Sequence, residues 1–381
     1  MLHKNIIIGA GPAGLAIAGR LKNVGEDFII LEASKNVGNS WRNHYNRLHL
    51  HTVKKYSHLP HLPFKEELPQ YVSKNDFVKY LEGYIAHFGI EPMYEHPVKS
   101  IEKPTEGWKV ITPKGAFHTE NVIVATGYNR VPIVPQFEGM AAFKNNLIHS
   151  NKYKSHKPFV GKKVLIIGMG NTGAEIALDL AEHDIAVSIS LRSAINIVPR
   201  DFYGRATQET AMKLHKLPNW LADKIGLILR EITIGNLKKY GIERPNEAPN
   251  AQVRKYGKIP VIDLGTIKMI KQGKVKIQPN VLQFNATSVT FANKQEIAFD
   301  EVILATGYAA QISDYLKIPK HYLDKKGTPL QAWFEEDELQ GLYFIGFNTA
   351  FTGILNSISI ESEKVVNRIL AKNKESFLSH G

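Results

Sequence analysis

The chain has 381 residues, which is long enough for two or three domains that each bury a core. Its composition is that of an ordinary globular protein, with 43% hydrophobic and 22% charged residues, and no apolar run is long enough to span a bilayer. Cysteine is absent, which excludes disulfides, thiolate metal sites and dithiol redox centres. The formal net charge is +12, but Lys and Arg are scattered along the sequence, so we expect no nucleic-acid partner.

The start of the chain bears on its location. The first buried strand is predicted to begin by Asn5, which leaves no length ahead of it for a cleavable leader. Because neither a leader nor a membrane segment nor a cysteine is present, we expect a cytoplasmic enzyme with no membrane partner.

A glycine-rich turn follows the first predicted strand. Residues 5–8 (NIII) form a buried run, and residues 9–14 (GAGPAG) match the dinucleotide-binding pattern GxGxxG at the start of a predicted helix. The helix N-terminus favours a pyrophosphate there. The next predicted strand, residues 28–31, ends at Glu32, whose carboxylate would accept hydrogen bonds from a ribose 2′-OH and repel a 2′-phosphate. The first turn is therefore predicted to bind an adenosine with free ribose hydroxyls.

The same arrangement occurs a second time with the opposite charge. Residues 163–167 (KVLII) precede residues 168–173 (GMGNTG), and the next predicted strand, residues 187–191, ends at Arg192 and Ser193. A guanidinium beside a hydroxyl suits a 2′-phosphate, so the second turn is predicted to bind NADPH. The two turns together predict a redox enzyme that uses two dinucleotides.

An internal repeat sets the predicted domain limits. The tetrapeptide ATGY follows a predicted strand at residues 125–128 and again at residues 305–308. We predict an α/β fold with two Rossmann-like dinucleotide-binding domains. Residues 1–155 and 300–381 form the predicted FAD domain, and residues 156–299 form the NADPH domain inserted into it. Within the insert, residues 208–240 are predicted to be helical, either as part of the core or as a lid over the substrate.

Several smaller elements are also predicted. Ser73 begins a capping box for a helix that runs to about Phe88, and residues 96–124 form a small sheet. Residues 341–346 form a strand, followed by a helix from about Ser357. We expect His49 and His51 to lie on one face of a strand.

At this point the chain resembles the class B flavin-dependent monooxygenases of the flavin-containing monooxygenase superfamily, and most of all the plant YUCCA branch with its bacterial relatives. Besides the two turns, the resemblance rests on Trp41 and on residues 45–51, 62–64, 77–81, 198–200, 257–266 and 341–347. The superfamily motif Phe-x-Gly-x-x-x-His-x-x-x-Phe/Tyr is matched from Phe143 to Tyr153, with His149 in place. Asn145 replaces the glycine, and because Asn tolerates positive φ best after Gly, we expect the turn to survive.

This resemblance implies an activity. FAD bound to the protein would take a hydride from NADPH and then react with dioxygen to form a C4a-(hydro)peroxyflavin, which oxygenates a small organic substrate. Likeness to the YUCCA branch implies oxidative decarboxylation of indole-3-pyruvate, whereas the bacterial relatives imply ketones, sulfides or amines. The sequence has His51 where enzymes of the animal type have an Asn near the flavin. The implied partners are the small-molecule substrate and O₂, and a homodimer is the oligomer we consider.

The resemblance and the two turns give a set of predicted site residues. The predicted catalytic residues are His51 and Asn356, and no metal site is expected, because no carboxylate joins His44, His49, His51, His58 and His61 at ligand spacing. The predicted FAD-binding residues are Gly9, Gly11, Pro12, Ala13, Gly14, Glu32, Ala33, Trp41, Arg42, His51, Thr52, Val98, Ala125, Thr126 and Gly127. The predicted NADPH-binding residues are Gly168, Gly170, Asn171, Thr172, Gly173, Arg192, Ser193, Ala305, Thr306, Gly307 and Tyr308.

The sequence leaves two other functions open. The first is an NADPH-driven flavin reductase or oxidase that passes electrons to a quinone, a redox protein or O₂ without oxygenating a substrate. The motif at residues 143–153 argues against it. The second is a non-catalytic flavoprotein that acts as a redox-responsive binding module. The presence of Glu32 and Arg192, each with the charge that suits the ribose of its predicted dinucleotide, argues against this function.

Overall fold

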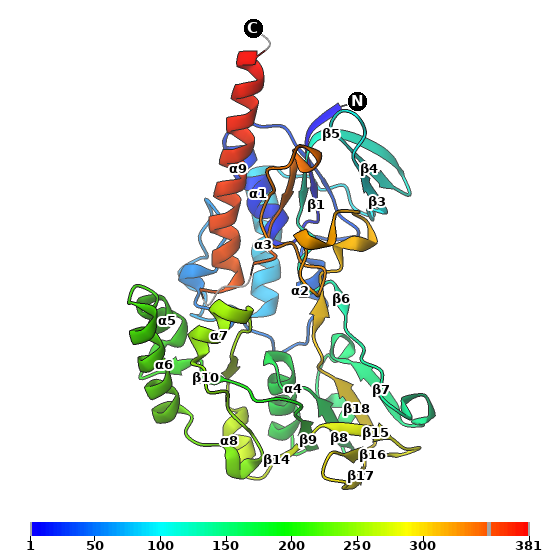
Figure 1. Cartoon of the computed structure of the whole chain (residues 1–381), viewed down its shortest axis with the longest axis vertical. Helices are drawn as coiled ribbons and strands as arrows, with labels where there is room; N and C mark the ends of the chain where they lie inside the picture. Colours follow the sequence, from blue (N-terminus) through cyan, green and yellow to red (C-terminus); the bar gives the residue numbers. More distant parts are fainter. Residues whose placement is uncertain (1, 349–351, 380–381) are drawn as a thin grey trace. The chain divides into compact units, whose positions relative to one another are not determined.

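The computed structural model describes residues 2–348 and 352–379 and consists of two compact units (Figure 1). The first unit comprises Met1–Asn43, Thr52–Val131 and Tyr308–Gly381. The second comprises His44–His51 and Pro132–Gly307. The polypeptide therefore passes from the first unit into the second twice, at residue 44 and at residue 132, and returns each time.

These limits differ from the predicted domains at three places. Residues 44–51, 132–155 and 300–307 group with the second unit, although the sequence placed all three in the FAD domain. The physical reason is strand pairing: β18 (Glu301–Leu304) lies between two strands of the second sheet, one of which is β7 (Asn146–His149). Both strands are therefore hydrogen-bonded parts of the second unit.

The sheet of the first unit has the order β2-β1-β5-β4-β3, with β20 also paired to β5. β1, β2, β5 and β20 are parallel, and β3, β4 and β5 form an antiparallel meander in the region 96–124, where the sequence predicted a small sheet. The strands are β1 (Leu2–Ile8), β2 (Ile29–Leu31), β3 (Ser100–Glu102), β4 (Trp108–Thr112), β5 (Gly115–Val124) and β20 (Leu342–Phe344). The two-residue strands β6 (Val131–Pro132) and β19 (Tyr308–Ala309) pair with each other.

Helices cover this sheet. The α-helices are α1 (Pro12–Asn23), α2 (Asn39–Arg42), α3 (Lys74–Phe88) and α9 (Ile354–Ser379), and the 3₁₀ turns are η1 (Lys54–Tyr56), η6 (Ile312–Asp314), η7 (Lys320–Tyr322) and η8 (Asp337–Leu339). α1 and α9 lie side by side (Figure 1), and Arg20 Nε donates to Ser362 Oγ at 2.9 Å. The predicted cap of α3 is confirmed, because Ser73 Oγ accepts from the Asp76 backbone N–H at 3.1 Å. Helix α9 begins three residues ahead of the predicted Ser357.

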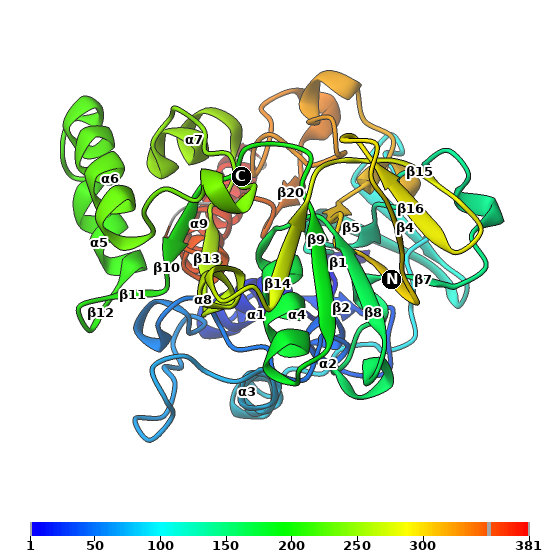
Figure 2. The same ribbon diagram turned by 90° about the horizontal axis from the view of Figure 1, so that it is seen from below.

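The sheet of the second unit is parallel throughout, with the order β14-β9-β8-β18-β7 (Figure 2 shows β14, β9 and β8 side by side). A separate antiparallel sheet contains β15, β16 and β17. The remaining strands of this unit are β8 (Lys163–Ile167), β9 (Ala186–Ser190), β10 (Ile197–Pro199), β11 (Asp201–Phe202), β12 (Arg205–Ala206), β13 (Val261–Asp263), β14 (Val275–Gln278), β15 (Val281–Phe284), β16 (Ser288–Phe291) and β17 (Glu296–Ala298). Its helices and 3₁₀ turns are α4 (Asn171–Glu182), α5 (Thr207–Leu214), α6 (Asn219–Thr233), α7 (Pro249–Tyr256), α8 (Thr266–Lys271), η2 (Met140–Ala142), η3 (Ser150–Lys152), η4 (Lys157–Phe159) and η5 (Lys238–Tyr240).

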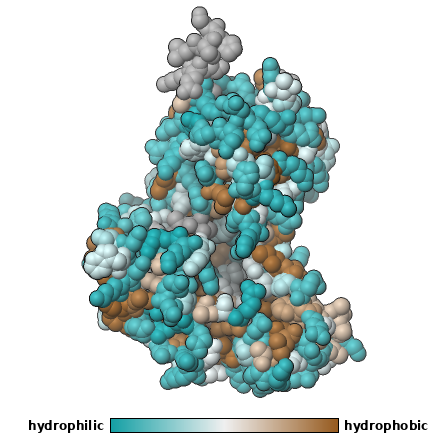
Figure 3. All heavy atoms as spheres, in the orientation of Figure 1, coloured by the Kyte–Doolittle hydropathy of each residue, from teal (hydrophilic) through white to brown (hydrophobic). Residues whose placement is uncertain are grey.

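The predicted helical segment at residues 208–240 is confirmed as α5, α6 and η5. It is not simply core. Trp220 and Ile232 on α6 are 69% and 64% exposed, and Figure 3 shows apolar surface over this helix. The buried positions of α6 are Ala222 and Arg230.

Two further observations complete the fold. The expectation of a strand carrying His49 and His51 is wrong, because the described segment 44–51 contains no strand. Among the described residues, no helix combines the length and the apolar character that crossing a membrane requires.

A pair of helical glycines tests the packing of α1 on α3. A Cβ at Gly19 would lie 2.0 Å from Tyr84 Oη, and Tyr84 is fully buried and donates to the Pro60 carbonyl at 2.9 Å. We expect Gly19→Ala to lower the free energy of unfolding by about 1–3 kcal/mol through overpacking. Gly83 on α3 faces open space, so Gly83→Ala should raise it by about 0.5–1 kcal/mol. Urea unfolding midpoints measure both changes, and equal signs would contradict the packing described.

Candidate functional site

The first glycine turn is built against the ends of two strands. Gly9 N–H donates to the Leu31 carbonyl of β2 at 2.9 Å, and Ala125 N–H, just after β5, donates to Ile8 at 2.9 Å. Gly9 has φ 106°, and a Cβ there would lie 2.8 Å from the Ala125 carbonyl oxygen. A Cβ at Gly14 would lie 1.9 Å from the Gly9 carbonyl oxygen. The predicted residues of the turn and Ala125 are therefore brought together.

The N-terminus of α1 leaves its backbone donors available. Its N-cap is Gly11, which makes no side-chain cap, and Pro12 is the first helical residue with no acidic side chain in the first turn. A Cβ at Gly11 would meet no other atom within 4 Å, so the space in front of this turn is open. Uncapped N–H groups beside open space fit the pyrophosphate of a dinucleotide.

Glu32 is hydrogen-bonded to the first glycine turn. The residue is buried, and its Oε2 accepts from Ala10 N–H at 2.7 Å, while Oε1 accepts from the N–H and the hydroxyl of Ser34 at 2.8 and 2.6 Å. It thereby holds the glycine turn against the end of β2. A carboxylate offers about four acceptor positions, so Glu32 retains capacity for a ribose hydroxyl.

The other predicted FAD residues of the first unit are engaged within the protein. Trp41 packs edge-on against Phe77, with ring centroids 4.5 Å apart, and Arg42 is paired with Glu82 at 2.5 Å. The hydroxyls of Thr52 and Thr126 are hydrogen-bonded to Ser57 and Tyr315, both at 2.7 Å. Ala33 is exposed, Val98 packs against the sheet core, and Gly127 has φ 79°. Contact of these residues with FAD stays a prediction.

The second glycine turn repeats the geometry of the first. Gly168 N–H donates to Ser190 of β9 at 3.0 Å, and Ala305 N–H donates to Ile167 of β8 at 2.9 Å. A Cβ at Gly168 would lie 2.6 Å from the Ala305 carbonyl oxygen, and a Cβ at Gly173 would lie 2.1 Å from the Gly168 carbonyl oxygen. The N-cap of α4 is Gly170, again with no side-chain cap. The second turn is thus equally suited to a pyrophosphate.

The predicted NADPH-binding residues differ in whether their side chains are hydrogen-bonded within the protein. Arg192 and Ser193 are exposed and begin two residues after the end of β9 at Ser190, and within the described part of the chain no hydrogen bond or ion pair involves Arg192. Asn171 Oδ1 instead accepts from Ile262 N–H at 2.7 Å, and the Thr306 hydroxyl donates to the Ile133 carbonyl at 2.5 Å. Among the described residues, Arg192 is therefore a cation that the fold leaves available for a 2′-phosphate.

The two predicted catalytic residues belong to different units. His51 lies in the second unit, where its Nε2 is hydrogen-bonded to Glu175 Oε1, and Glu175 is 2% exposed. Asn356 lies on α9 in the first unit and is half-buried, and Tyr308 also belongs to the first unit. Their catalytic roles stay a prediction.

Sequence reasoning missed the acidic face of α4. Glu175, Asp179 and Glu182 follow one another at intervals of four and three residues, which places them on one side of the helix. Arg47 Nη1 lies 2.7 Å from Glu182 Oε2 and 3.4 Å from Asp179 Oδ1, so this face anchors the segment 44–51. The spacing of the three carboxylates was the available signal, but the sequence did not show what they bind.

The superfamily motif is placed around the same helix. Tyr153 is buried and donates to Asp179 Oδ2 at 2.5 Å, and burial together with this carboxylate raises the pKa of its phenol. His149 Nε2 lies 3.2 Å from the Gly307 carbonyl, and burial lowers the pKa of its imidazole. Asn145 does not adopt positive φ, so tolerance of that conformation is not what suits Asn to this position; its side-chain amide donates to the Phe299 carbonyl at 2.8 Å.

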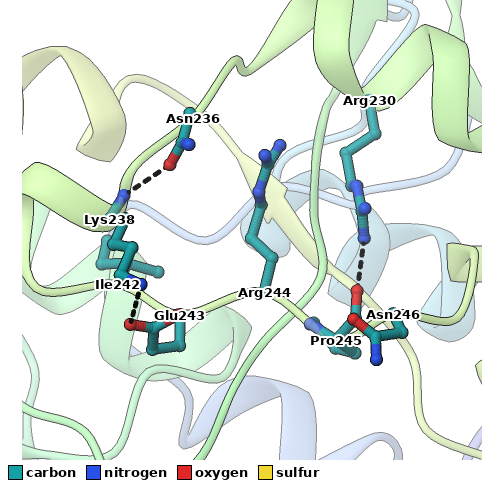
Figure 4. Close-up of a pocket in the computed structure, with 8 residues that line it drawn as sticks. All are labelled: Arg230, Asn236, Lys238, Ile242, Glu243, Arg244, Pro245 and Asn246. Carbon is teal, nitrogen blue, oxygen red and sulfur yellow. Dashed lines mark hydrogen bonds and ion pairs between the residues drawn. The ribbon is translucent and has the colours of Figure 1, made fainter.

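A cationic pocket of about 200 Å³ lies in the helical segment (Figure 4). Its walls are Arg230, Asn236, Lys238, Ile242, Glu243, Arg244, Pro245 and Asn246. Arg244 pairs with Glu231 at 2.9 Å, and Arg230 donates to the Pro245 carbonyl at 2.9 Å. Lys238 also lies 4.0 Å from Glu243. Most of the positive charge of the pocket is therefore balanced by carboxylates of the protein.

Comparison with known proteins places the chain among flavin enzymes. Residues 6–213 match the family model described as pyridine nucleotide-disulphide oxidoreductase. The probable indole-3-pyruvate monooxygenase YUCCA3 of Arabidopsis thaliana is 38% identical, over 97% of this chain and 88% of its own. The indole-3-pyruvate monooxygenase YUCCA8 of Oryza sativa subsp. japonica is 36% identical, over 91% and 87%. The structure of a flavin-containing monooxygenase from Stenotrophomonas maltophilia matches with a TM-score of 0.75 at 19% identity, over 97% of this chain and 99% of that one, and shares the fold.

Substitutions of two glycines in the first turn are expected to affect FAD binding and folding differently. Gly11→Ala fills open space, so we expect a stably folded protein that loses FAD. Gly14→Ala places a methyl group against the Gly9 carbonyl, so we expect loss of stability of about 3 kcal/mol or more. Flavin absorbance per chain and thermal unfolding of FAD-free protein distinguish the two variants. A Gly11→Ala protein with a full complement of FAD would refute the first site.

Arg192 can be tested through cofactor preference. A charge-assisted contact to a phosphate contributes about 1.5–3 kcal/mol, so Arg192→Ala should raise the KM for NADPH by roughly ten- to a hundredfold and leave that for NADH nearly unchanged. Steady-state flavin reduction with each nucleotide measures this. Arg200→Ala, which removes an arginine paired with Asp201 at 3.2 Å, is the control. Equal effects on both nucleotides would show that Arg192 does not read the 2′-phosphate.

Proposed function

Because the chain belongs to the class B flavin-dependent monooxygenases and is related to the YUCCA enzymes over most of its length, we propose that it decarboxylates a 2-oxo acid of the indole-3-pyruvate type. The enzyme uses FAD, NADPH and O₂ on a small organic substrate. The observation that carries the proposal is the pair of glycine turns, each followed by a residue whose charge suits the ribose of a different dinucleotide. The turns occur in a chain of which 97% aligns with YUCCA3 at 38% identity.

Each unit has a separate binding task in this proposal. The uncapped N-terminus of α1 holds the pyrophosphate of FAD, and Glu32 accepts from its ribose. The uncapped N-terminus of α4 holds the pyrophosphate of NADPH, and Arg192 binds its 2′-phosphate. FAD, when bound, supplies the two-electron redox chemistry and the reaction with dioxygen.

The proposed reaction balances with these reactants. A 2-oxo acid anion, O₂, NADPH and a proton give a carboxylate shorter by one carbon, CO₂, NADP⁺ and water. The bond between the carboxyl carbon and the keto carbon breaks, and one oxygen atom of O₂ enters at the keto carbon. NADPH supplies the two electrons that reduce the other oxygen atom to water. The chain must hold both cofactors and keep bulk water from the reaction.

His51 is the proposed proton-holding residue of the second unit. Its Nε2 shares a hydrogen bond with Glu175 Oε1, and the other oxygen of this buried carboxylate has no hydrogen-bond partner among the described residues. Such a pair can hold a proton at Nε2 and fix the orientation of the ring. Asn356 is proposed as a positioning group from α9. A cytoplasmic location and a homodimer stay predictions.

Isotope labelling tests the reaction. With ¹⁸O₂, NADPH and indole-3-pyruvate, we expect one ¹⁸O atom per molecule of indole-3-acetate and a 1:1 ratio of NADPH consumed to product, because one oxygen atom of O₂ enters the acid. Mass spectrometry of the product and absorbance of NADPH measure both. Indole-3-lactate, which has a hydroxyl in place of the keto group, is the matched control and should give no product. Oxidation of NADPH with stoichiometric hydrogen peroxide and no labelled acid would favour the reductase or oxidase.

A further inference from the structure

Two histidines and a buried carboxylate of the second unit form a cluster that neither cofactor site uses. His156 is the residue before η4, Asp179 lies in the last turns of α4, and His183 is the residue after that helix. The potential ligand atoms of the three side chains all lie within 4.8 Å of one another. The expectation of no metal site rested on the histidines between residues 44 and 61, so it did not consider these three residues.

The distances match the requirements of a divalent metal. His156 Nδ1 and His183 Nδ1 lie 3.6 and 3.7 Å from the same oxygen, Asp179 Oδ1. Two ligands of a tetrahedral ion at about 2.1 Å are roughly 3.4 Å apart, so each nitrogen lies close to the separation from Asp179 Oδ1 that two ligands of one ion require. The two imidazole rings are stacked, with centroids 3.3 Å apart and planes 10° from parallel. Because a metal lies in the plane of each imidazole that binds it, at least one ring must rotate out of this stack before both nitrogens face a common ion, and the exposed His183 is the ring with room to do so.

The carboxylate is held in a ligand-like position by its surroundings. Asp179 is 6% exposed, and its Oδ2 accepts a hydrogen bond from Tyr153 at 2.5 Å. This bond leaves Oδ1 directed at the imidazoles and fixes the orientation of the carboxylate, as outer partners do in established metal sites. His156 is half-buried and His183 exposed, so an ion can enter from solvent.

We propose that His156, Asp179 and His183 form a binding site for a divalent transition-metal ion of the Zn²⁺ type. Two imidazoles and one carboxylate are the ligand set that zinc accepts with a water molecule in the fourth position. The ion would tie the segment before β8 to the end of α4. His183 Nδ1 now donates to the Asp179 backbone carbonyl at 2.7 Å, so binding exchanges this proton for the metal.

Arg47 competes for the same oxygen. Its Nη1 lies 3.4 Å from Asp179 Oδ1 and nearer, at 2.7 Å, to Glu182 Oε2. A positive charge this close to a ligand oxygen opposes binding of a cation, so removal of the guanidinium should favour the metal. The proposal therefore predicts two opposite changes in metal affinity. Removal of a ligand should lower the affinity, and removal of the Arg47 guanidinium should raise it.

Zinc binding to the metal-free protein at pH 7.5, measured by competition with a chromophoric chelator, tests the proposal. We expect one Zn²⁺ per chain, affinity at least tenfold lower in His183→Ala, and higher affinity in Arg47→Met. His118→Ala, which removes an exposed histidine of β5, is the matched control and should bind as the unchanged protein does. Circular dichroism of each variant in chelator verifies folding.

The outcomes separate this site from adventitious binding. Equal affinities in His183→Ala and His118→Ala, or no stoichiometric Zn²⁺ on the unchanged protein, would overturn the proposal. Affinity that falls or stays constant in a folded Arg47→Met protein would show that Asp179 Oδ1 is not a ligand. Because the measurement uses no substrate and no NADPH, its result is independent of the proposed oxygenase reaction.

Discussion

Both units depend on the close approach of a helix to the turn that precedes it. At Gly14 and Gly173 a Cβ would lie 1.9 and 2.1 Å from the carbonyl oxygens of Gly9 and Gly168, so no larger side chain fits without moving the helix. This approach sets the direction of α1 and α4 over their sheets. It also directs the uncapped N–H groups of each helix at the space in front of the turn, where an anion is stabilised.

On this common frame, single residues at the ends of β2 and β9 are proposed to determine which dinucleotide each unit accepts. Glu32 is built into the fold by hydrogen bonds to Ala10 and Ser34, whereas Arg192 is exposed without such support. We therefore expect a substitution at Arg192 to leave the structure intact. A substitution at Glu32 would disturb the glycine turn as well, so its proposed contact with a ribose cannot be altered separately from the fold.

Local patterns in the sequence predicted the elements and the glycine turns, but not all partnerships between them. Ser73 and the ATGY repeats mark a helix start and two strand ends, because these signals depend on near neighbours. The pairing of β7 with β18 joins residues about 150 positions apart, and no local pattern encodes it. The cluster at Asp179 and the attachment of segment 44–51 to α4 were missed for the same reason: each needs the folded path of the chain to bring its residues together.

The duplicated strand pairing has a consequence for how the protein is made. Ile8 pairs with Val124 and Ile167 with Leu304 in equivalent parallel registers, so β1 and β8 present similar edges to similar strands. On the ribosome β5 emerges before β8 exists, and synthesis therefore assigns β5 to β1 without competition. β7, in contrast, has no partner strand until β18 is synthesised about 150 residues later, and the nascent second sheet stays incomplete over that interval. Refolding from denaturant loses this order of appearance and exposes the chain to exchange of partners between its two halves.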